Sequence, residues 1–284
     1  MSTSKEMTTL GVVMRFRNSA ATLPRVLNAL AAQTRKPEVI IGLDNGSTDG
    51  SRAMLERRGA HIVDWTQPYH VSRVLNCGLA ACATDLVVVL SSHSVLIETD
   101  IFARYEAAFA NPLVAAASHR YRGVARYRDE IDLTHVQRLG LVRGSIYSNS
   151  DGCLRRRYWE ESPFDERLGF AAEDYDWALT QLKKGRLIQL LTFAHEHIRT
   201  SIPPKLFLKT SRDVRAIANK HRLALAKWGA GGDLYEPLHA LYWFAKCLGR
   251  DPEARLNLFN QLGWARGALD WRRYDPFTTK ADLT

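Results

Sequence analysis

The sequence lacks several features that would place it in a specialised class of protein. It has four cysteines in 284 residues and no CxxC pair, which argues against a zinc knuckle or a disulfide framework. No apolar run approaches the roughly 20 residues that a membrane-spanning helix needs. The opening MSTSKEMTTL has no apolar core of the kind found in secretory signals. Internal repeats and low-complexity tracts are also absent. We therefore expect a globular protein that resides in the cytoplasm.

Acidic residues are outnumbered, and the positive excess is concentrated in one segment. The formal net charge is +9 at pH 7, and residues 199–228 carry eight Lys or Arg against one Asp. Residues 205–228 place apolar and basic side chains at helical spacing, which is typical of a helix that binds an anionic membrane surface. Such a protein would lie peripherally at the inner face of the cell membrane. The alternatives are that the apolar face packs on the rest of the chain or forms a homodimer interface.

Strand and helix patterns alternate through the first hundred residues. Short apolar runs predict strands over 10–16, 37–44, 61–65 and 85–92. Helices are predicted after Thr22, over 51–58 and over 72–83, the first with Thr22 as its N-cap and Pro24 in its first turn. Nearly continuous apolar strands are typical of a parallel sheet that helices cover on both faces.

The pattern loosens after residue 100. A helix over 100–110 and a strand over 114–118 are followed by residues 120–145, which have no clean period and are predicted to form a long loop or lid. A helix over 173–184, ending at Gly185, and a strand over 187–193 come next. Beyond Pro203, helices are predicted over 205–228, 237–248 and 252–271.

Polar residues follow two of the predicted strands. In parallel sheets ligands bind beyond the carboxyl ends of the strands, so Asp44–Asn45 and Ser91–His93 are expected on the same rim. A carboxylate and an amide there can bind the edge of a nucleobase. The alternative is a simple turn, because Asn-Gly and Asp-Gly pairs are common turn formers.

Four segments in order resemble one known family. They are VVMRFRN with VIIGLDNGSTDGS, SRVLNCGLAACATDLVVVLSSHSVL, SDGCLRRRYWEESPFDERLGFAAEDYDWALTQLKKG, and TFAHEH. Together, over about residues 10–200, they resemble a family 2 glycosyltransferase with the GT-A fold. The resemblance implies an α/β, Rossmann-like, mostly parallel sheet flanked by helices. It also implies inverting transfer of a sugar from a nucleoside-diphosphate sugar to an acceptor hydroxyl of a glycan or lipid-linked saccharide.

The sequence pattern and the extent of the resemblance divide the chain, and the resemblance assigns residues. Residues 1–9 are expected to be a disordered lead-in, 10–202 a catalytic domain, and 203–284 a helical extension. Within the catalytic domain, 10–120 is the nucleotide-sugar half and 121–202 the acceptor and catalytic half. The expected donor contacts are Arg15, Arg17, Asp44, Asn45, Arg73, Ser91, Ser92 and His93.

Glu173 and Asp174 begin a predicted helix, where the helix dipole favours negative charge. Inverting transfer needs one base to take the proton of the attacking hydroxyl. By resemblance Asp174 is that catalytic base and Glu173 its catalytic neighbour. The alternative is a pair of acids that merely cap the helix.

The chain departs from the family at the metal motif. Ser91-Ser92-His93 stands where members have Asp-x-Asp, whose last Asp binds a divalent ion that bridges the sugar diphosphate. Imidazole suits Mn²⁺ better than Mg²⁺, so the predicted metal is Mn²⁺, with His93, His195 and His197 as candidate ligands. Whether a metal is needed stays open, as does the choice between His195 and His197. A His93 that binds the diphosphate directly is the alternative.

Two other functions are consistent with these patterns. The basic composition is compatible with a glycosyltransferase that acts on nucleic acid or a natural product, although no nucleic-acid-binding motif is recognisable. The altered metal motif is compatible with a non-catalytic relative that binds a nucleotide sugar. The sequence does not identify the sugar or the base of the donor.

Overall fold

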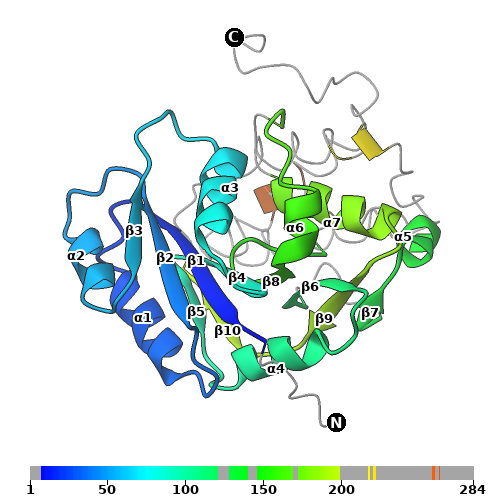
Figure 1. The fold of residues 1–284 in the computed structure, drawn as a ribbon, viewed down its shortest axis with the longest axis horizontal. Coiled ribbons are helices and arrows are strands. Elements are labelled where there is room, and N and C mark those ends of the chain that lie inside the picture. Colours follow the sequence, from blue (N-terminus) through cyan, green and yellow to red (C-terminus); the bar gives the residue numbers. More distant parts are fainter. Residues whose placement is uncertain are drawn as a thin grey trace, which may run out of the picture.

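The computed structural model describes residues 8–120, 128–139, 146–168 and 172–198, together with six residues nearer the C-terminus (Figure 1). Those six are Ile217, Lys220, His221, Leu258, Phe259 and Leu262. The elements are β1 (Leu10–Phe16), α1 (Leu23–Ala32), β2 (Val39–Asp44), α2 (Ser51–Glu56), β3 (His61–Asp64), α3 (Val71–Ala81), β4 (Leu86–Ser91), β5 (Ser94–Leu96), α4 (Ile101–Ala108), β6 (Val114–His119), β7 (Glu130–Ile131), α5 (Leu133–Leu139), β8 (Cys153–Arg155), α6 (Arg156–Glu161), α7 (Glu173–Lys183), β9 (Leu187–Leu191) and β10 (His195–His197).

Eight strands form one sheet in the order β3-β2-β1-β4-β8-β6-β9-β7. β1 pairs in parallel with β2 and β4, β2 with β3, and β6 with β9. β8 and β7 run antiparallel to their neighbours, and β5 and β10 form a separate antiparallel pair. The predicted α/β class and mostly parallel sheet are therefore confirmed.

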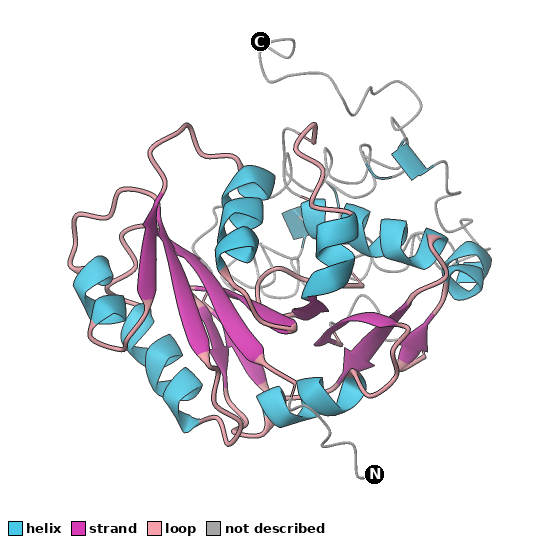
Figure 2. Cartoon of the chain, viewed as in Figure 1, coloured by secondary structure: helices cyan, strands magenta, loops and turns pink. Residues whose placement is uncertain are grey.

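Helices cover both faces of the large sheet (Figure 2). Val13 of β1 belongs to a core cluster that includes residues of α3 and α7, whereas Val12 and Met14 belong to a second cluster with residues of α1 and α4. Val87 and Val89 of β4 join the first cluster. Since successive strand residues point to opposite faces, a sheet covered twice requires apolar residues at every position. All of β4 is buried, as its sequence LVVVLS predicts.

Helix α3 lies very close to the sheet at Gly78. A Cβ atom there would be 2.6 Å from Leu43 Cδ1 and 2.7 Å from Val13 Cγ1, nearer than carbon atoms approach in packed cores. The glycine therefore allows α3 to sit directly on β1 and β2. Those strands end at the residues expected to contact the donor.

The elements predicted for the first hundred residues are all present, with ends that differ by one or two residues at most. Thr22 occupies the N-cap of α1, and a proline stands in the first turn, but the Thr22 side chain makes no cap hydrogen bond. Its hydroxyl donates instead to Ser92 O at 2.7 Å and to Ser19 O at 3.2 Å. The threonine therefore ties α1 to the end of β4.

The prediction of a long loop over 120–145 is wrong for part of that segment. Residues 128–139 contain β7 and α5, and the rest of the segment lies outside the described residues. The short elements β5, β8 and α6 were not predicted either. None of these three is longer than six residues, too short to show a clear period.

The predicted C-terminal helices lie outside the described residues except at the six positions named above, and so does most of the predicted lead-in. The division into domains therefore stays a prediction. Among the residues that the structure does describe, no helix is long and apolar enough to cross a membrane.

Candidate functional site

The carboxyl ends of β1, β2 and β4 lie side by side at one edge of the sheet, which we call the carboxyl edge. Phe16 is in register with Asp44, and Arg15 with Ser91. Because these strands are parallel, residues far apart in the sequence share one rim, as predicted.

Asp44 ends β2 and is 4% exposed. Its Oδ1 accepts a hydrogen bond from Ser47 N at 2.8 Å, and its Oδ2 lies 3.7 Å from Arg52 Nη1. The following residue, Asn45, donates its N–H to Phe16 O at 3.1 Å. The carboxylate therefore does stabilise a turn, as the alternative interpretation predicted. The nucleobase contact of Asp44 and Asn45 stays a prediction.

Arg15 joins three parts of the chain. Its Nη2 donates to Ser91 Oγ at 3.4 Å, and its Nη1 donates to Asn149 O at 3.2 Å. Ser91 N donates to Ser150 O at 2.9 Å, so the turn over residues 146–152 is fixed across the end of β4. Arg15 pairs with no carboxylate in the part of the chain that is described. Its charge at the carboxyl edge is thus available to an anionic group.

The two residues after Ser91 are held by their backbones and, at Ser92, also by the side-chain hydroxyl. Ser92 O accepts from Thr22, and Ser92 Oγ lies 2.9 Å from Ser19 Oγ. His93 O accepts from Ile198 N at 2.8 Å, which joins this loop to the end of β10. Serine fits here because its short hydroxyl bonds to the neighbouring loop.

The imidazole of His93 stands edge-on to that of His197, with ring centroids 4.5 Å apart. Burial, then the neighbouring His197 and Arg15, lower the pKa of His93 to about 4. His93 is therefore neutral at pH 7, the form that ligates metal ions. Glu196 points to the other side of β10, where its Oε1 accepts from Arg25 Nη1 at 3.0 Å.

His195 has different surroundings from His197. Its Nε2 lies 3.4 Å from Asp151 Oδ2, and its ring centroid is 4.9 Å from that of His119. Burial, then His119 and His197, lower the pKa of His195 to about 4. No sequence pattern had indicated His119 or Asp151, since each reaches His195 only through the sheet order.

The histidines do not form a complete metal site by themselves. Across the described ranges, no group of three or more His, Cys, Asp or Glu side chains is arranged to hold a metal ion. His93 and His197 are close, whereas the ring centroids of His195 and His197 are 6.4 Å apart. Imidazole nitrogens suit Mn²⁺ better than Mg²⁺, and the metal roles of these histidines stay predictions.

Glu173 and Asp174 begin α7, as predicted, and Glu173 is 3% exposed. Asp174 Oδ1 accepts from Tyr175 N at 2.8 Å. The preceding residue, Ala172, has φ +86°, a left-handed conformation that residues with a Cβ rarely adopt. Such conformations cost on the order of 1–3 kcal/mol and are found at functional sites.

Both carboxylates contact Asn149. Its backbone N donates to Asp174 Oδ2 at 3.4 Å, and its Nδ2 donates to Glu173 Oε1 at 3.2 Å. Because Arg15 donates to Asn149 O, predicted donor and catalytic residues meet around one residue. Asn149 was not predicted, because the local sequence SNSDG has only the pattern of a turn.

Two predicted donor contacts are not joined to this network. Arg17 is exposed after the end of β1. The Arg73 side chain is 59% exposed, and its Nε lies 3.4 Å from Glu166 Oε2. Their roles toward a donor stay predictions.

Helix α7 also binds part of the C-terminal segment. Ile217 is 2% exposed and belongs to the same core cluster as α7. Lys220 Nζ lies 2.6 Å from Asp165 Oδ2 and 2.8 Å from Asp176 Oδ2, and His221 Nε2 lies 2.8 Å from Asp176 Oδ1. These contacts support the alternative in which the segment over 205–228 packs on the catalytic domain.

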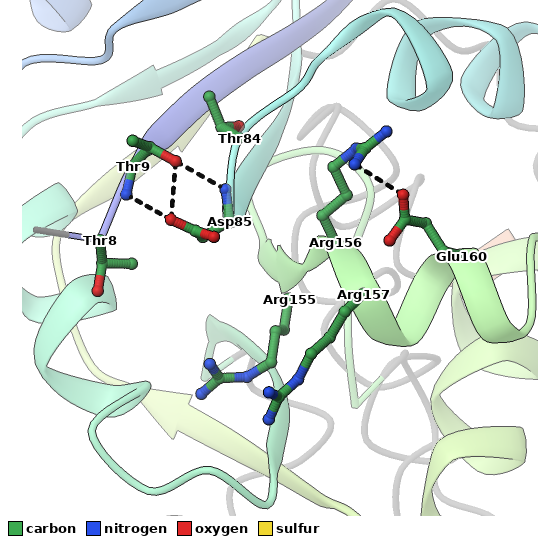
Figure 3. Close-up of a pocket in the computed structure, with 8 residues that line it drawn as sticks. All are labelled: Thr8, Thr9, Thr84, Asp85, Arg155, Arg156, Arg157 and Glu160. Carbon is green, nitrogen blue, oxygen red and sulfur yellow. Dashed lines mark hydrogen bonds and ion pairs between the residues drawn. The ribbon is translucent and has the colours of Figure 1, made fainter. Parts of the chain in front are cut away.

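A pocket of about 470 Å³ lies at the opposite edge of the sheet, beside the start of β4 (Figure 3). It is lined by Thr8, Thr9, Thr84, Asp85, Arg155, Arg156, Arg157 and Glu160. Arg155 Nη2 donates to Phe109 O at 2.7 Å, and its Nε donates to Val114 O at 3.2 Å. This arginine thus holds the end of α4 against the sheet. None of the predicted site residues lines the pocket.

Comparison with known sequences supports the resemblance seen in the motifs. The model of the family described as Glycosyl transferase family 2 matches residues 11–163, more than half of the chain. No protein of curated function matches the sequence.

Solved structures share the fold at low sequence identity. A mannosyltransferase from Pyrobaculum calidifontis, in complex with GDP-Man and Mn²⁺, is 16% identical with a TM-score of 0.66, over 94% of this chain and 88% of that one. Glucosyl-3-phosphoglycerate synthase from Mycobacterium tuberculosis, with Mn²⁺, UDP-Glc and phosphoglyceric acid, is 18% identical with a TM-score of 0.56, over 76% and 80%. TarS from S. aureus, in complex with UDP, is 13% identical with a TM-score of 0.54, over 93% and 91%. The predicted GT-A type of α/β fold is confirmed by these likenesses.

Proposed function

The chain belongs to glycosyl transferase family 2, and on that premise we propose that it transfers a sugar, with inversion, from a nucleoside-diphosphate sugar to an acceptor hydroxyl. The observation that carries this proposal is the convergence on one turn of Arg15 and the Glu173–Asp174 pair. A cation for the leaving diphosphate and a carboxylate for the attacking hydroxyl are the two groups that such a reaction needs.

We assign the donor to the carboxyl edge. The Asp44 carboxylate and the Asn45 amide would contact the nucleobase. Ser91, Ser92 and His93 would lie along the diphosphate, with the Arg15 guanidinium facing it. As the bond between the anomeric carbon and the diphosphate breaks, negative charge grows on the β-phosphate. A fixed guanidinium lowers the energy of that state. Support comes from the Arg15–Ser91 contact of 3.4 Å.

We assign the base to Asp174. Its carboxylate would take the proton of the acceptor hydroxyl while the hydroxyl oxygen forms its bond to the anomeric carbon. The nucleoside diphosphate leaves from the opposite face, which inverts the configuration. The start of α7 supports this role, because the helix dipole favours the ionised carboxylate that a base requires. Glu173 stands beside it as a second carboxylate.

We propose that a divalent ion, with Mn²⁺ favoured, would be held by His93 and His197. Bound there, it would neutralise charge on the diphosphate. The support is the 4.5 Å spacing of the two rings and the neutral state of His93. The mannosyltransferase and the synthase named above were both solved with Mn²⁺.

For the acceptor and the cellular location we propose only a class. The acceptor is a hydroxyl of a glycan or a lipid-linked saccharide, used in a cytoplasmic setting. Peripheral attachment to an anionic membrane through residues 205–228 would need basic side chains other than Lys220, which is bound to Asp165 and Asp176. Sedimentation with anionic vesicles at low salt tests it, and absence of binding removes the idea.

Two measurements test the proposed reaction. Thermal shift with UDP and GDP, with and without Mn²⁺, identifies the nucleotide, because a bound ligand raises the apparent stability. Release of that nucleotide from UDP-Glc or GDP-Man is then compared between the wild type and Asp174→Asn. Loss of the base should slow release by about 100-fold or more. Asp100→Asn, at the exposed start of α4, is the matched control.

Equal rates in the wild type and Asp174→Asn would refute the base assignment. Nucleotide binding without any release, in every protein tested, would instead favour a non-catalytic relative that binds nucleotide sugars.

A further inference from the structure

We propose that Asn149 is a positioning residue for the reaction, which holds Glu173 and Asp174 in place and ties them to Arg15 on the donor side. This inference rests on the proposed function, because it gives Asn149 its task through the proposed base.

Backbone hydrogen bonds fix the turn that carries Asn149 to the sheet, independently of the Asn149 side chain. Gly152 N donates to Ser148 O at 2.9 Å, and Val89 N of β4 donates to Gly152 O at 2.8 Å. A Cβ atom at Gly152 would lie 2.5 Å from Ser148 O, a distance that excludes every other residue without a backbone shift. The turn is therefore a rigid platform on β4.

The side chain of Asn149 serves a buried carboxylate. Asn149 is 1% exposed and Glu173 is 3% exposed. In the described part of the chain, Asn149 Nδ2 is the hydrogen-bond donor that reaches the Glu173 carboxylate, at 3.2 Å. A carboxylate removed from water needs such a donor to stay ionised.

The orientation of this amide is explained by Glu173 and not by general packing. Asn149 Oδ1 is buried and has no donor among the residues that the structure describes. By contrast, the Asn76 amide uses both of its halves. Asn76 Oδ1 accepts from Trp159 and Phe164, and its Nδ2 donates to Phe164 O and Glu166. Asn76 is only half-buried and is still fully satisfied. Asn149 is almost completely buried, where polar groups are normally hydrogen-bonded, so its half-satisfied amide points to a task set by Glu173.

The backbone of Asn149 links the two sides of the reaction. Its carbonyl accepts from Arg15, and its N–H donates to Asp174. A shift of this one residue would therefore move the guanidinium and the base together. Among the described residues, His70 interacts electrostatically with Glu173, and Tyr147 interacts with both Glu173 and Asp174.

The test uses two nearly isosteric variants of the full chain. Asn149→Leu removes the amide, and Asn149→Asp adds a third carboxylate beside Glu173 and Asp174. The matched control is Asn111→Asp, because Asn111 Nδ2 also donates to a glutamate, Glu130 Oε2 at 3.3 Å, but at an exposed site.

The first readout is urea unfolding at neutral and mildly acidic pH, which needs no ligand. Like charges raise the carboxyl pKa in the folded state, so Asn149→Asp should lose most stability at neutral pH and recover as one carboxyl protonates on acidification. Asn149→Leu should show a smaller loss with the same direction of pH dependence, because it removes the donor to the Glu173 carboxylate without adding a charge. If Asn149→Asp shows no more pH dependence than Asn111→Asp, the proposal is overturned.

The second readout is release of the nucleotide from whichever donor the wild type uses. Asn149→Leu should lower kcat by roughly tenfold or more with little change in the donor KM, because the contact from Arg15 to the backbone remains. In Asn149→Asp the acidic limb of the rate profile should move to higher pH. An unchanged kcat in Asn149→Leu overturns the positioning role. No release from any donor by the wild type counts against the proposed function, while the unfolding data still decide the Asn149 contact.

Discussion

Replacement of Asn76 by alanine should destabilise the protein strongly, although the residue lies on a helix and outside the proposed chemistry. The Asn76 amide joins α3 to α6 and to the loop before α7. Its Oδ1 accepts from Trp159 Nε1 at 3.0 Å and from Phe164 N at 3.1 Å, and its Nδ2 donates to Phe164 O at 3.0 Å. Trp159 is 6% exposed and Phe164 is 2% exposed.

The magnitude follows from the groups that lose their partner. In Asn76→Ala, the Trp159 indole N–H and the backbone N–H and carbonyl of Phe164 lose the hydrogen bonds that they make with the Asn76 amide. Each unpaired neutral group costs about 1–3 kcal/mol if it stays dry. Because Asn76 itself is half-buried, water can reach part of the gap, so we expect a total loss of about 2–4 kcal/mol. The better helix propensity of alanine returns about 0.5 kcal/mol.

The assay is urea unfolding at neutral pH, with Asn28→Ala as the matched control. Asn28 is an exposed helical asparagine on α1 whose Oδ1 accepts from Arg58 at 2.7 Å. Its replacement should change the free energy of unfolding by no more than about 0.5 kcal/mol. If the free energies of unfolding of Asn76→Ala and Asn28→Ala differ by less than about 1 kcal/mol, the reasoning about the Asn76 amide is refuted.

Three further predictions concern the packing of α7, the packing of α3 and the donor edge. Lys220→Met should cost about 2–3 kcal/mol at pH 7, since Asp176 is 3% exposed and Lys220 is 18% exposed. Burial alone would raise the pKa of Asp165, but hydrogen bonds from Arg167 and Lys220 hold it below its usual range. That stability is complete at neutral pH and lost below about pH 4, so the Lys220→Met deficit in urea unfolding should shrink on acidification. Gly78→Ala should lose about 1–2 kcal/mol in the same assay, because overpacking outweighs the gain in helix propensity. His93→Asp should make nucleotide binding more dependent on Mn²⁺ in calorimetric titrations with UDP and GDP.

The first half of the fold could be predicted because its strands are buried on both faces. LGVVMRF, VIIGLD and LVVVLS are apolar along almost their whole length, and α1 shows a regular stripe. The later elements β5, β8 and α6 are too short to show a period. β5 forms by pairing with β10, and β8 is placed between β4 and β6 of the large sheet, with α6 directly after it. Such tertiary contacts leave no local pattern.

The candidate site divides in the same way. Asp44, Ser91 and Glu173 could be placed from sequence, because each stands at the end of a strand or the start of a helix. Asn149 and His119 could not, since their importance depends on the strand order β4-β8-β6. The residues that Asn149 and His119 contact at the site are at least 24 positions away in the sequence, the separation between Asn149 and Glu173.

His93 stands where the family resemblance implies a carboxylate, and a neutral imidazole gives the donor edge a different charge. This is why nucleotide binding should depend more strongly on Mn²⁺ in His93→Asp. His93 is neutral at pH 7 because burial lowers its pKa to about 4, with Arg15 among the neighbours that oppose its protonation. A carboxylate at that position would face Arg15 and compensate its charge, so a diphosphate would then need an added cation. With a neutral imidazole, Arg15 keeps its charge for the diphosphate. If nucleotide binding by the wild type were lost without Mn²⁺ to the same degree as in His93→Asp, this account of the donor edge would be wrong.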